Sequence, residues 1–272
     1  MRNNPAQPAP RTAWGINVSP RLAGRVAGWA ILAMALIAPF AEFYVRQRLV
    51  VPKDAGATAT NLAAHETLFR LGIVAFLVVI ILDVVVAWGL YVLLKPVSTS
   101  VAVLMAWARL VYAVIFAVAV VNLLNAIHLV TDRTYQAAFP PTQRNAQTMA
   151  SLNAFSAGWA VALVFFGIHL ILVGYLAIES GYVPKLIGVL LVIAGLGYTA
   201  DSFIGFLVPD YVATAALFTF VGELVLALWL VIRGKTIPDT TDTRTNRPGG
   251  HPATGTSGEA GDVVKDPITS RA

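Results

Sequence analysis

The residues best suited to chemistry are four ionisable side chains that stand in the middle of four different apolar stretches: Asp83, Arg109, His169 and Glu223. Asp83, for example, lies within LVVIILDVVVAWGL, residues 77–90, where its neighbours are all apolar. An isolated charge in such surroundings is costly, so it must pair with an opposite charge or give up its own. Intramembrane Asp, Glu and His side chains are also the groups that take up and release protons.

These four residues are predicted to lie in one layer, which we call the central layer. With a helical rise of ~1.5 Å per residue, they lie ~12–16 Å from the same end of their helices. Asp83 and Arg109 belong to one tight hairpin at nearly equal depth, so we expect them to pair and the other two residues to complete a network. Such a layer either fixes the register of the helices or forms a path for protons or ions. One pair would fix the register, so the presence of four groups favours the second interpretation.

A second set of polar residues, which we call the outer cluster, is predicted nearer the opposite end of the helices. Asn122, Asn125 and His128 repeat every three residues and form a stripe that faces away from Arg109. The other members fall at a similar height: Glu42, Arg70, Asn153 and Asp201. Hydrogen bonding between helices and contact with lipid headgroups explain such a cluster, and we favour this interpretation. The alternative is a polar vestibule that opens outward and leads to the central layer.

The sequence predicts no catalytic residue, no metal site and no cofactor. It contains no H-E-x-x-H, G-x-S-x-G or P-loop motif, and it has no cysteine. A metal ion held by Asp83, His169 and Glu223 would be opposed by the neighbouring Arg109. His128 and His169 are predicted at different heights, which argues against a haem held by two imidazoles.

The composition indicates a membrane protein. The chain has 272 residues, of which 57% are hydrophobic and 12% are charged, and its mean hydropathy is +0.73. A soluble domain carries roughly twice that charged fraction. The net charge of +5 comes from Lys and Arg residues spread over tails and loops, so it reports membrane orientation rather than nucleic-acid binding. We expect the lipid bilayer as a partner and no nucleic acid.

Six apolar stretches are long enough to cross a bilayer, which requires about 20 residues each. They lie near 25–45, 69–94, 101–129, 155–178, 186–207 and 213–232. The predicted fold is all-α, with a six-helix transmembrane domain over 21–233 between disordered tails at 1–20 and 234–272. We interpret the first stretch as a retained helix rather than a cleaved signal peptide, because Arg46 and Arg48 follow it directly.

The connections predict hairpins on one side and short helices on the other. Those at 95–100 and 179–185 are tight, so the helices that they join should be antiparallel. Asp54 can cap a short extracytoplasmic helix through ATATNLAAHE, and Thr142 can cap another through QRNAQTMA, residues 143–150. Each of the two is expected to run into the next spanning helix. More of the Lys and Arg residues near the helices fall on the side of the N-terminus, which predicts that both termini are cytoplasmic.

An offset of 86 residues aligns part of the chain with itself. It places Phe69 on Phe155, Leu110 on Leu196 and, in the central layer, Asp83 on His169. The helix pair 69–94 and 101–129 and the pair 155–178 and 186–207 are therefore predicted to be parallel copies, as in some transporters.

Five phrases carry a resemblance to a known family: EFYVRQRLVVPKDAGATATNLAAHETLFRLGI, DVVVAWGLYVLLKPV, WARLVYAVI, FFGIHLILVGYL and, as the most specific, SGYVPKLIGVLLVIAGLGYTADSF. Together they resemble the bacterial membrane family called domain of unknown function 4386. The likeness runs from about Arg21 to Arg233. It implies a six-helix inner-membrane protein with a retained first helix, and it implies no activity, substrate or catalytic residue.

The leading hypothesis is a transport-like or conducting membrane protein whose central layer handles protons or a small solute. The alternative is a structural or accessory membrane protein in which the layer only holds the helices together. An intramembrane enzyme is a third and least favoured class. A water-accessible layer joined to the outer cluster would favour transport, and a dry, fully paired layer would favour the structural role. The sequence leaves the substrate and the oligomeric state open.

Overall fold

A computed structural model describes residues 18–208, 211 and 216–234, and for 216–220 it describes only the backbone. Nearly all of both predicted tails, and the first residues of the predicted span at 213–232, lie outside this part of the chain. Every regular element in the described part is a helix. In chain order the elements are α1 (Pro20–Pro39), η1 (Phe40–Arg46), α2 (Gln47–Leu49), α3 (Ala55–Ala64), α4 (Glu66–Leu94), α5 (Thr99–Thr131), α6 (Arg133–Ala138), α7 (Pro141–Ser180), α8 (Lys185–Leu207) and α9 (Ala216–Arg233).

Five of these stretches are long and apolar enough to cross a membrane: Pro20–Leu49, which combines α1, η1 and α2, then α4, α5, α7 and α8. They identify the chain as an all-α, multi-pass membrane protein. The bounds of α4, α5 and α8 lie within three residues of the predicted ones. The sixth predicted span corresponds to α9, which is outside this set of five and whose first side chains are not described.

The start of α7 corrects the predicted cap of this helix. α7 is a single helix from Pro141 to Ser180, so the stretch 143–150 runs into the span as predicted, but the N-cap is Pro140 and not Thr142. Pro141 takes a first-turn position, where its missing N–H breaks no helical hydrogen bond. No Gly or Pro then follows before Phe155. Nothing therefore interrupts the helix between 143–150 and the span.

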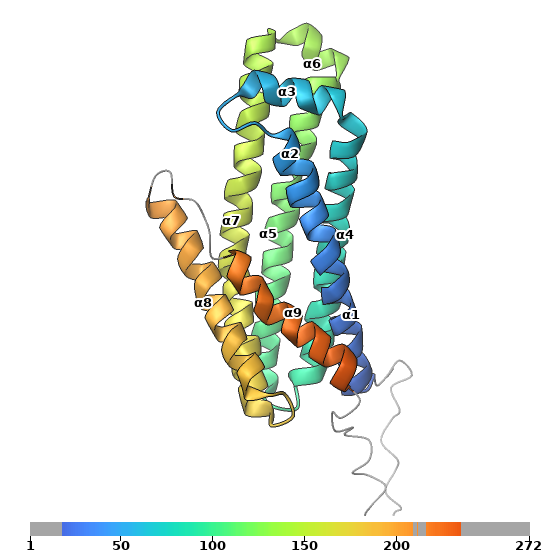
Figure 1. Cartoon of the computed structure of the whole chain (residues 1–272), viewed down its shortest axis with the longest axis vertical. Helices are drawn as coiled ribbons and strands as arrows, with labels where there is room; N and C mark the ends of the chain where they lie inside the picture. Colours follow the sequence, from blue (N-terminus) through green and yellow to red (C-terminus); the bar gives the residue numbers. More distant parts are fainter. Residues whose placement is uncertain (1–17, 209–210, 212–215, 235–272) are drawn as a thin grey trace, which may run out of the picture. The chain divides into compact units, whose positions relative to one another are not determined.

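Two short helices lie at the same end of the bundle (Figure 1). α3 is the one that the sequence predicted, and the Asp54 side chain caps it by accepting a hydrogen bond from the Ala57 N–H at 2.8 Å. The sequence did not predict α6, which follows directly after α5. Asp132 caps α6 by accepting from the Thr134 N–H, and hydrogen bonding with Thr134 lowers the pKa of this carboxyl.

The first span changes its winding after Pro39. Pro39 has no N–H with which to continue the α-helical hydrogen bonds, and the chain runs on as a π-helix over η1. The Gln47 N–H then bonds to the carbonyl oxygen of Glu42, five residues earlier, and a short α-helical turn ends the span at Leu49. The wider winding lets Glu42 lie on the buried side of the helix, where it is 8% exposed.

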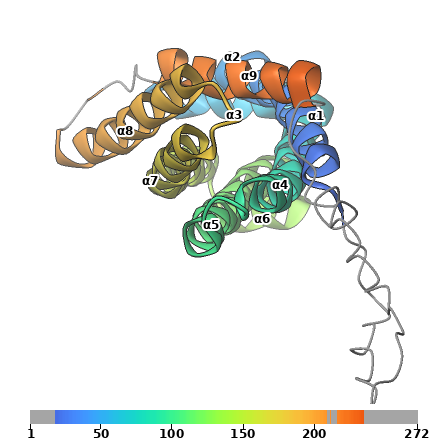
Figure 2. The ribbon, with the colours of Figure 1, turned by 90° about the horizontal axis from the view of Figure 1, so that it is seen from below.

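The long helices of the described part pack in a closed series, each against the next. α5 lies between α4 and α7, and α7 packs against α8 (Figure 2). α1 packs against α4, and α9 packs against α1 and α8 (Figure 1). The predicted hairpins α4–α5 and α7–α8 are present, with their turns at the end opposite to α3 and α6.

Glycines bring α7 and α8 into close contact. Gly167 faces Gly195, and Gly174 faces Gly188. A Cβ atom at Gly174 would lie 2.5 Å from the Gly188 carbonyl oxygen, and one at Gly188 would lie 2.7 Å from the Gly174 carbonyl oxygen. These glycines therefore allow the close packing of α7 on α8, which fixes the position of α7 on which His169 depends.

The turn between α7 and α8 is attached to α4. The Tyr182 hydroxyl donates a hydrogen bond to the carbonyl oxygen of Leu93 at 2.8 Å, and burial raises the pKa of Tyr182 to about 12. Gly181 ends α7 with a φ of 72°, a left-handed conformation that glycine adopts without strain. This turn therefore couples the α7–α8 hairpin to the helix that carries Asp83.

Candidate functional site

Arg109 lies at the centre of the central layer and contacts its three other members. Its Nε donates to Asp83 Oδ1 at 2.9 Å, and its Nη2 lies 2.8 Å from the same oxygen. Its Nη1 lies 3.0 Å from His169 Nε2 and donates to Glu223 Oε1 at 3.2 Å. A single guanidinium therefore joins side chains from α4, α5, α7 and α9 in one network.

The contacts of His169 define which of its nitrogens carries the hydrogen. Its Nδ1 lies 2.9 Å from the backbone carbonyl oxygen of Met105, which can only accept, so Nδ1 donates. Arg109 can only donate, so His169 Nε2 accepts. His169 is therefore a neutral imidazole in this network. Both imidazole nitrogens already have partners, so His169 and Glu223 join the network through Arg109.

The central layer is almost fully buried, and its ionised forms carry more negative than positive charge. Asp83, Arg109 and His169 are 0% exposed, and Glu223 is 8% exposed. Two carboxyl groups share one guanidinium beside a neutral imidazole, so the ionised forms sum to one negative charge. Asp83 Oδ2 is buried and has no hydrogen-bond partner among the described residues. The layer is electrically balanced only when it takes up one proton or one cation.

The hairpin α4–α5 explains why Asp83 meets Arg109. Asp83 precedes the end of α4 by about as many residues as Arg109 follows the start of α5, so the tight turn sets them at one level. Phe166 supports the guanidinium from α7, with the Arg109 Cζ 5.4 Å from the ring centre. Sequence reasoning missed Phe166, although its spacing of three residues from His169 places both on one helix face.

The surroundings of the layer show no built metal site in the described part of the chain. No group of three or more His, Asp and Glu side chains is arranged to hold a metal there. Arg109 occupies the space between the two carboxyl groups. Two apolar grooves of about 360 and 330 Å³ lie on the outer face of α4 and α5, where they share Trp107 and Leu110. Neither groove is lined by a residue of the central layer.

The structure distributes the outer cluster over separate contacts. In the described part of the chain, no hydrogen bond or ion pair joins two of its seven members. Three of them have other side-chain partners: Glu42 with Arg46, Arg70 with Glu66, and Asp201 with Tyr211. Asn122 bonds to the carbonyl oxygen of Ala119 in its own helix, and the last three are exposed: Asn125, His128 and Asn153. In the described part of the chain, the outer cluster is therefore not joined by direct contacts between its members.

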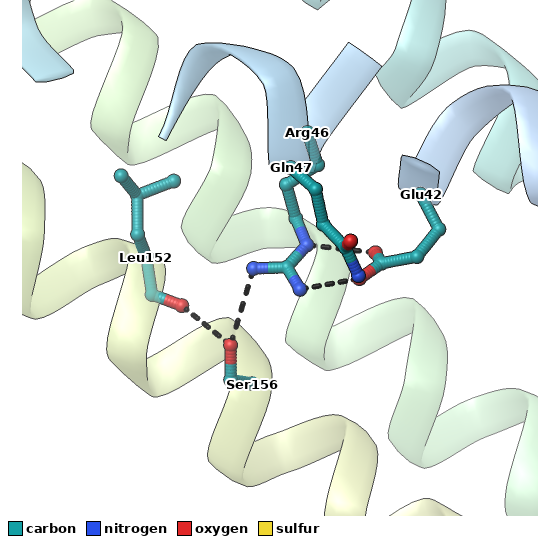
Figure 3. A network of polar contacts seen from close by, with 5 residues as sticks. All are labelled: Glu42, Arg46, Gln47, Leu152 and Ser156. Carbon is teal, nitrogen blue, oxygen red and sulfur yellow. Dashed lines mark hydrogen bonds and ion pairs between the residues drawn. The ribbon is translucent and has the colours of Figure 1, made fainter. Parts of the chain in front are cut away.

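A compact polar contact surrounds Glu42 in η1 (Figure 3). Arg46 forms an ion pair with Glu42 and donates to Ser156 Oγ on α7 at 3.4 Å, and Gln47 donates to Glu42 Oε1 at 3.0 Å. The Arg46 guanidinium also lies 5.4 Å from the centre of the Phe155 ring. Sequence reasoning missed Arg46 as a partner, although four residues separate it from Glu42. This contact ties the end of the first span to α7.

Comparisons with known proteins relate the chain to others by sequence. A 171-residue stretch is 38% identical to a protein of Archaeoglobus fulgidus described as an uncharacterized protein, and it covers 63% of this chain and 88% of that one. No solved structure matches the chain. The family model described as Domain of unknown function (DUF4386) matches residues 26–234, nearly the whole range over which the sequence phrases carry the resemblance. The chain belongs to this family.

Proposed function

We propose that this chain is a membrane protein that binds and releases one proton in its central layer, in a transport-like role. The observation that carries the proposal is the charge of the buried layer, where two carboxyl groups share one guanidinium. A layer that served packing alone should balance its charges, because a surplus charge out of water destabilises the folded protein. A surplus intramembrane carboxyl group is instead what proton uptake and release require.

A proton suits the layer better than a metal cation does. Hard divalent cations such as Ca²⁺ and Mg²⁺ take about six or more oxygen ligands, and Arg109 stands where such a cation would sit. A proton needs only one carboxyl oxygen. Because Asp83 and Glu223 both contact Arg109, protonation of one carboxyl group changes the environment of the other. The two acids are therefore linked through the same guanidinium.

Proton flux into vesicles that contain the purified protein tests this proposal. We expect an imposed pH gradient to decay faster than in empty vesicles. Glu223→Gln should return the rate to that of empty vesicles while the protein still folds and inserts, because an amide does not carry the proton. His169→Ala removes an acceptor that orients Arg109, and we expect it to lower the rate as well.

The matched control is Glu179→Gln, which neutralises an exposed carboxyl group near the end of α7. It should leave the flux unchanged. Flux equal to that of empty vesicles across pH and candidate solutes, measured on folded parent protein, would reject the transport role.

A structural or accessory role is the second candidate, and the complete burial of three of the four residues favours it. The network connects α4, α5, α7 and α9, so it can fix their packing without any chemistry. In that role Glu223→Gln would be nearly silent in function, and losses of stability would follow the number of contacts removed.

For the arrangement in the membrane, we propose six spans, with α9 as the sixth, both termini in the cytoplasm, and α3 and α6 on the other side. The five long apolar helices and the distribution of Lys and Arg support this arrangement. We also propose that α4–α5 and α7–α8 are parallel repeats. Asp83 and His169, which the 86-residue offset aligns, both contact Arg109, and this supports the repeat.

A further inference from the structure

We infer that Glu223 on α9 is the carboxyl group through which the central layer exchanges its proton with the surroundings. The inference rests on the proposed proton-handling function and adds the place of exchange. That place is the flank of the protein covered by α9, rather than a path that runs along the helices.

Glu223 is the least enclosed member of the central layer. Its side chain keeps 10% of its surface exposed, whereas the side chains of Asp83 and Arg109 keep 0%. Its contact with Arg109 is also longer, at 3.2 Å, than the contacts of 2.8 and 2.9 Å between Arg109 and Asp83. A proton that comes from outside therefore meets Glu223 before it meets any other member.

Aromatic rings close the layer toward the end that carries α3 and α6. Phe76, Phe116, Phe155 and Trp159 form what we call the aromatic cluster, in which every two ring centres lie 5.2–6.2 Å apart. The three Phe residues are 0–1% exposed. Rings packed this closely leave no room for a file of water.

Tyr112 extends the aromatic cluster down to the central layer. Its ring lies 5.8 Å from Phe116 and 4.8 Å from Phe166, and Phe166 in turn lies under Arg109. A continuous series of ring contacts therefore runs from Arg109 to Phe155. The Phe155 ring in turn lies beside Arg46, near the end of the first span. They fill the route that a polar vestibule would have taken.

Apolar side chains close the layer in the opposite direction. Leu90, Met105 and Val173 lie one to two turns beyond Asp83, Arg109 and His169, and they are 1%, 0% and 1% exposed. Among the described residues both directions along the helices are blocked, and the partial exposure of Glu223 points to the α9 flank as the approach.

The charged and titratable groups around Glu223 come from several helices. Arg109 on α5 contacts it directly, and behind Arg109 lie Asp83 on α4 and the neutral His169 on α7. The two helices packed against α9 carry five more such groups: Arg21 and Arg25 on α1, and Lys185, Tyr198 and Asp201 on α8. Of these, Tyr198 reaches the level of the layer, since its ring lies 5.3 Å from Phe166, whereas Arg25 lies beside Gly234 at the far end of α9. Proton exchange at Glu223 is therefore set chiefly by Arg109.

Labelling of the full chain in membranes with dicyclohexylcarbodiimide, an apolar reagent, tests the inference. The reagent adds to a protonated carboxyl group. The carboxyl oxygen bonds to the central carbon of the reagent, the proton moves to a reagent nitrogen, and the adduct rearranges to a stable N-acylurea without a leaving group. We expect mass spectrometry to find the adduct at Glu223 and not at Asp83, and we expect labelling to fall as the pH is raised.

Two variants assign the label. Glu223→Gln should abolish the adduct on the α9 peptide, and Glu179→Gln should leave it unchanged. Labelling of Asp83 ahead of Glu223 would overturn the inference, and so would an unlabelled Glu223 at every pH at which the protein stays folded.

The vesicle assay separates this inference from the proposed function. Flux that depends on the central layer, with no label at Glu223, would keep the proton function and reject this place of exchange. A label at Glu223 without flux would keep the place of exchange and reject transport.

Discussion

At the scale of single residues, the central layer depends most on Arg109, because Arg109 is the one cation among its four members. If the guanidinium is removed, two buried carboxyl groups are left with no positive partner. If the Asp83 carboxylate is removed, Arg109 still pairs with Glu223. Removal of the Arg109 guanidinium should therefore destabilise the protein more than removal of the Asp83 carboxylate, although both break the contact between them.

Arg109→Gln is expected to lower the free energy of unfolding by about 3–5 kcal/mol, the usual cost of breaking a buried ion pair from one side. Asp83→Asn should cost less, and Asp83→Asn in the Arg109→Gln background should recover part of the larger loss. Thermal unfolding in detergent measures all three variants. Strictly additive losses would show that the two residues are not coupled.

The control for this series is Arg70→Gln. It breaks a surface pair with Glu66 in which the side chains are 41% and 40% exposed. Such pairs contribute little, so the change should stay within ~0.5 kcal/mol. A loss as large as that of Arg109→Gln would contradict the importance given to burial.

The layer itself could be predicted from the sequence, but its contacts could not. Depth follows from the helical rise, which by itself places Asp83 and Arg109 at one level. Which side chain turns to which neighbour depends on the rotation of each helix about its axis. α4 and α5 are apolar on nearly every face, so their sequences give no period that fixes this rotation. This is why the contact of His169 with Arg109, rather than with Glu223, emerged only from the packing.

At the scale of helices, the contact between α7 and α8 determines where His169 lies. Gly174 and Gly188 let the two backbones approach so closely that a Cβ atom at either glycine would clash with the backbone of the other. In a bilayer, small residues are what allow helices to pack this closely. A larger residue at this contact would push α7 and α8 apart and shift His169 from Arg109.

Gly188→Ala is expected to lower the free energy of unfolding by about 1–3 kcal/mol, as overpacking does in a well-packed core. The control on the same helix is Gly205→Ala, whose Cβ would meet, among the described residues, the Tyr211 ring at 3.8 Å. Alanine has the higher helix propensity, so this control should be neutral or slightly stabilising. Thermal unfolding compares the two variants, and similar effects at both positions would reject the close contact as the cause.

The helices also show where sequence reasoning works and where it fails. Turn residues and charges bound α4, α5 and α8, so their ends were predicted within three residues. For α7 the predicted cap was wrong, because the helix already begins at Pro141 and Thr142 lies within it. Pro39 indicates a change in the helix before η1, but a proline alone does not predict whether a helix will bend, break or widen into a π-helix.

At the scale of the whole molecule, the number of spans decides on which side of the membrane the chain ends. With a cytoplasmic N-terminus, the five spans Pro20–Leu49, α4, α5, α7 and α8 leave the end of α8 outside. If α9 crosses as well, Arg233 returns to the cytoplasm. If α9 lies in or on the membrane without crossing, Arg233 stays outside. The position of Arg233 therefore tests the sixth span directly.

Reporter fusions read this position. Green fluorescent protein, which folds to its fluorescent form on the cytoplasmic side, should be bright when fused after Arg233 and dark when fused after Ala138 in the α5–α7 connection. Alkaline phosphatase, which is active only outside, should give the opposite pattern. External signals from both positions would reduce the protein to five spans and leave Glu223 on a helix that does not cross. A full reversal of the pattern would invert the orientation and keep all six spans, because the two positions would still lie on opposite sides of the membrane.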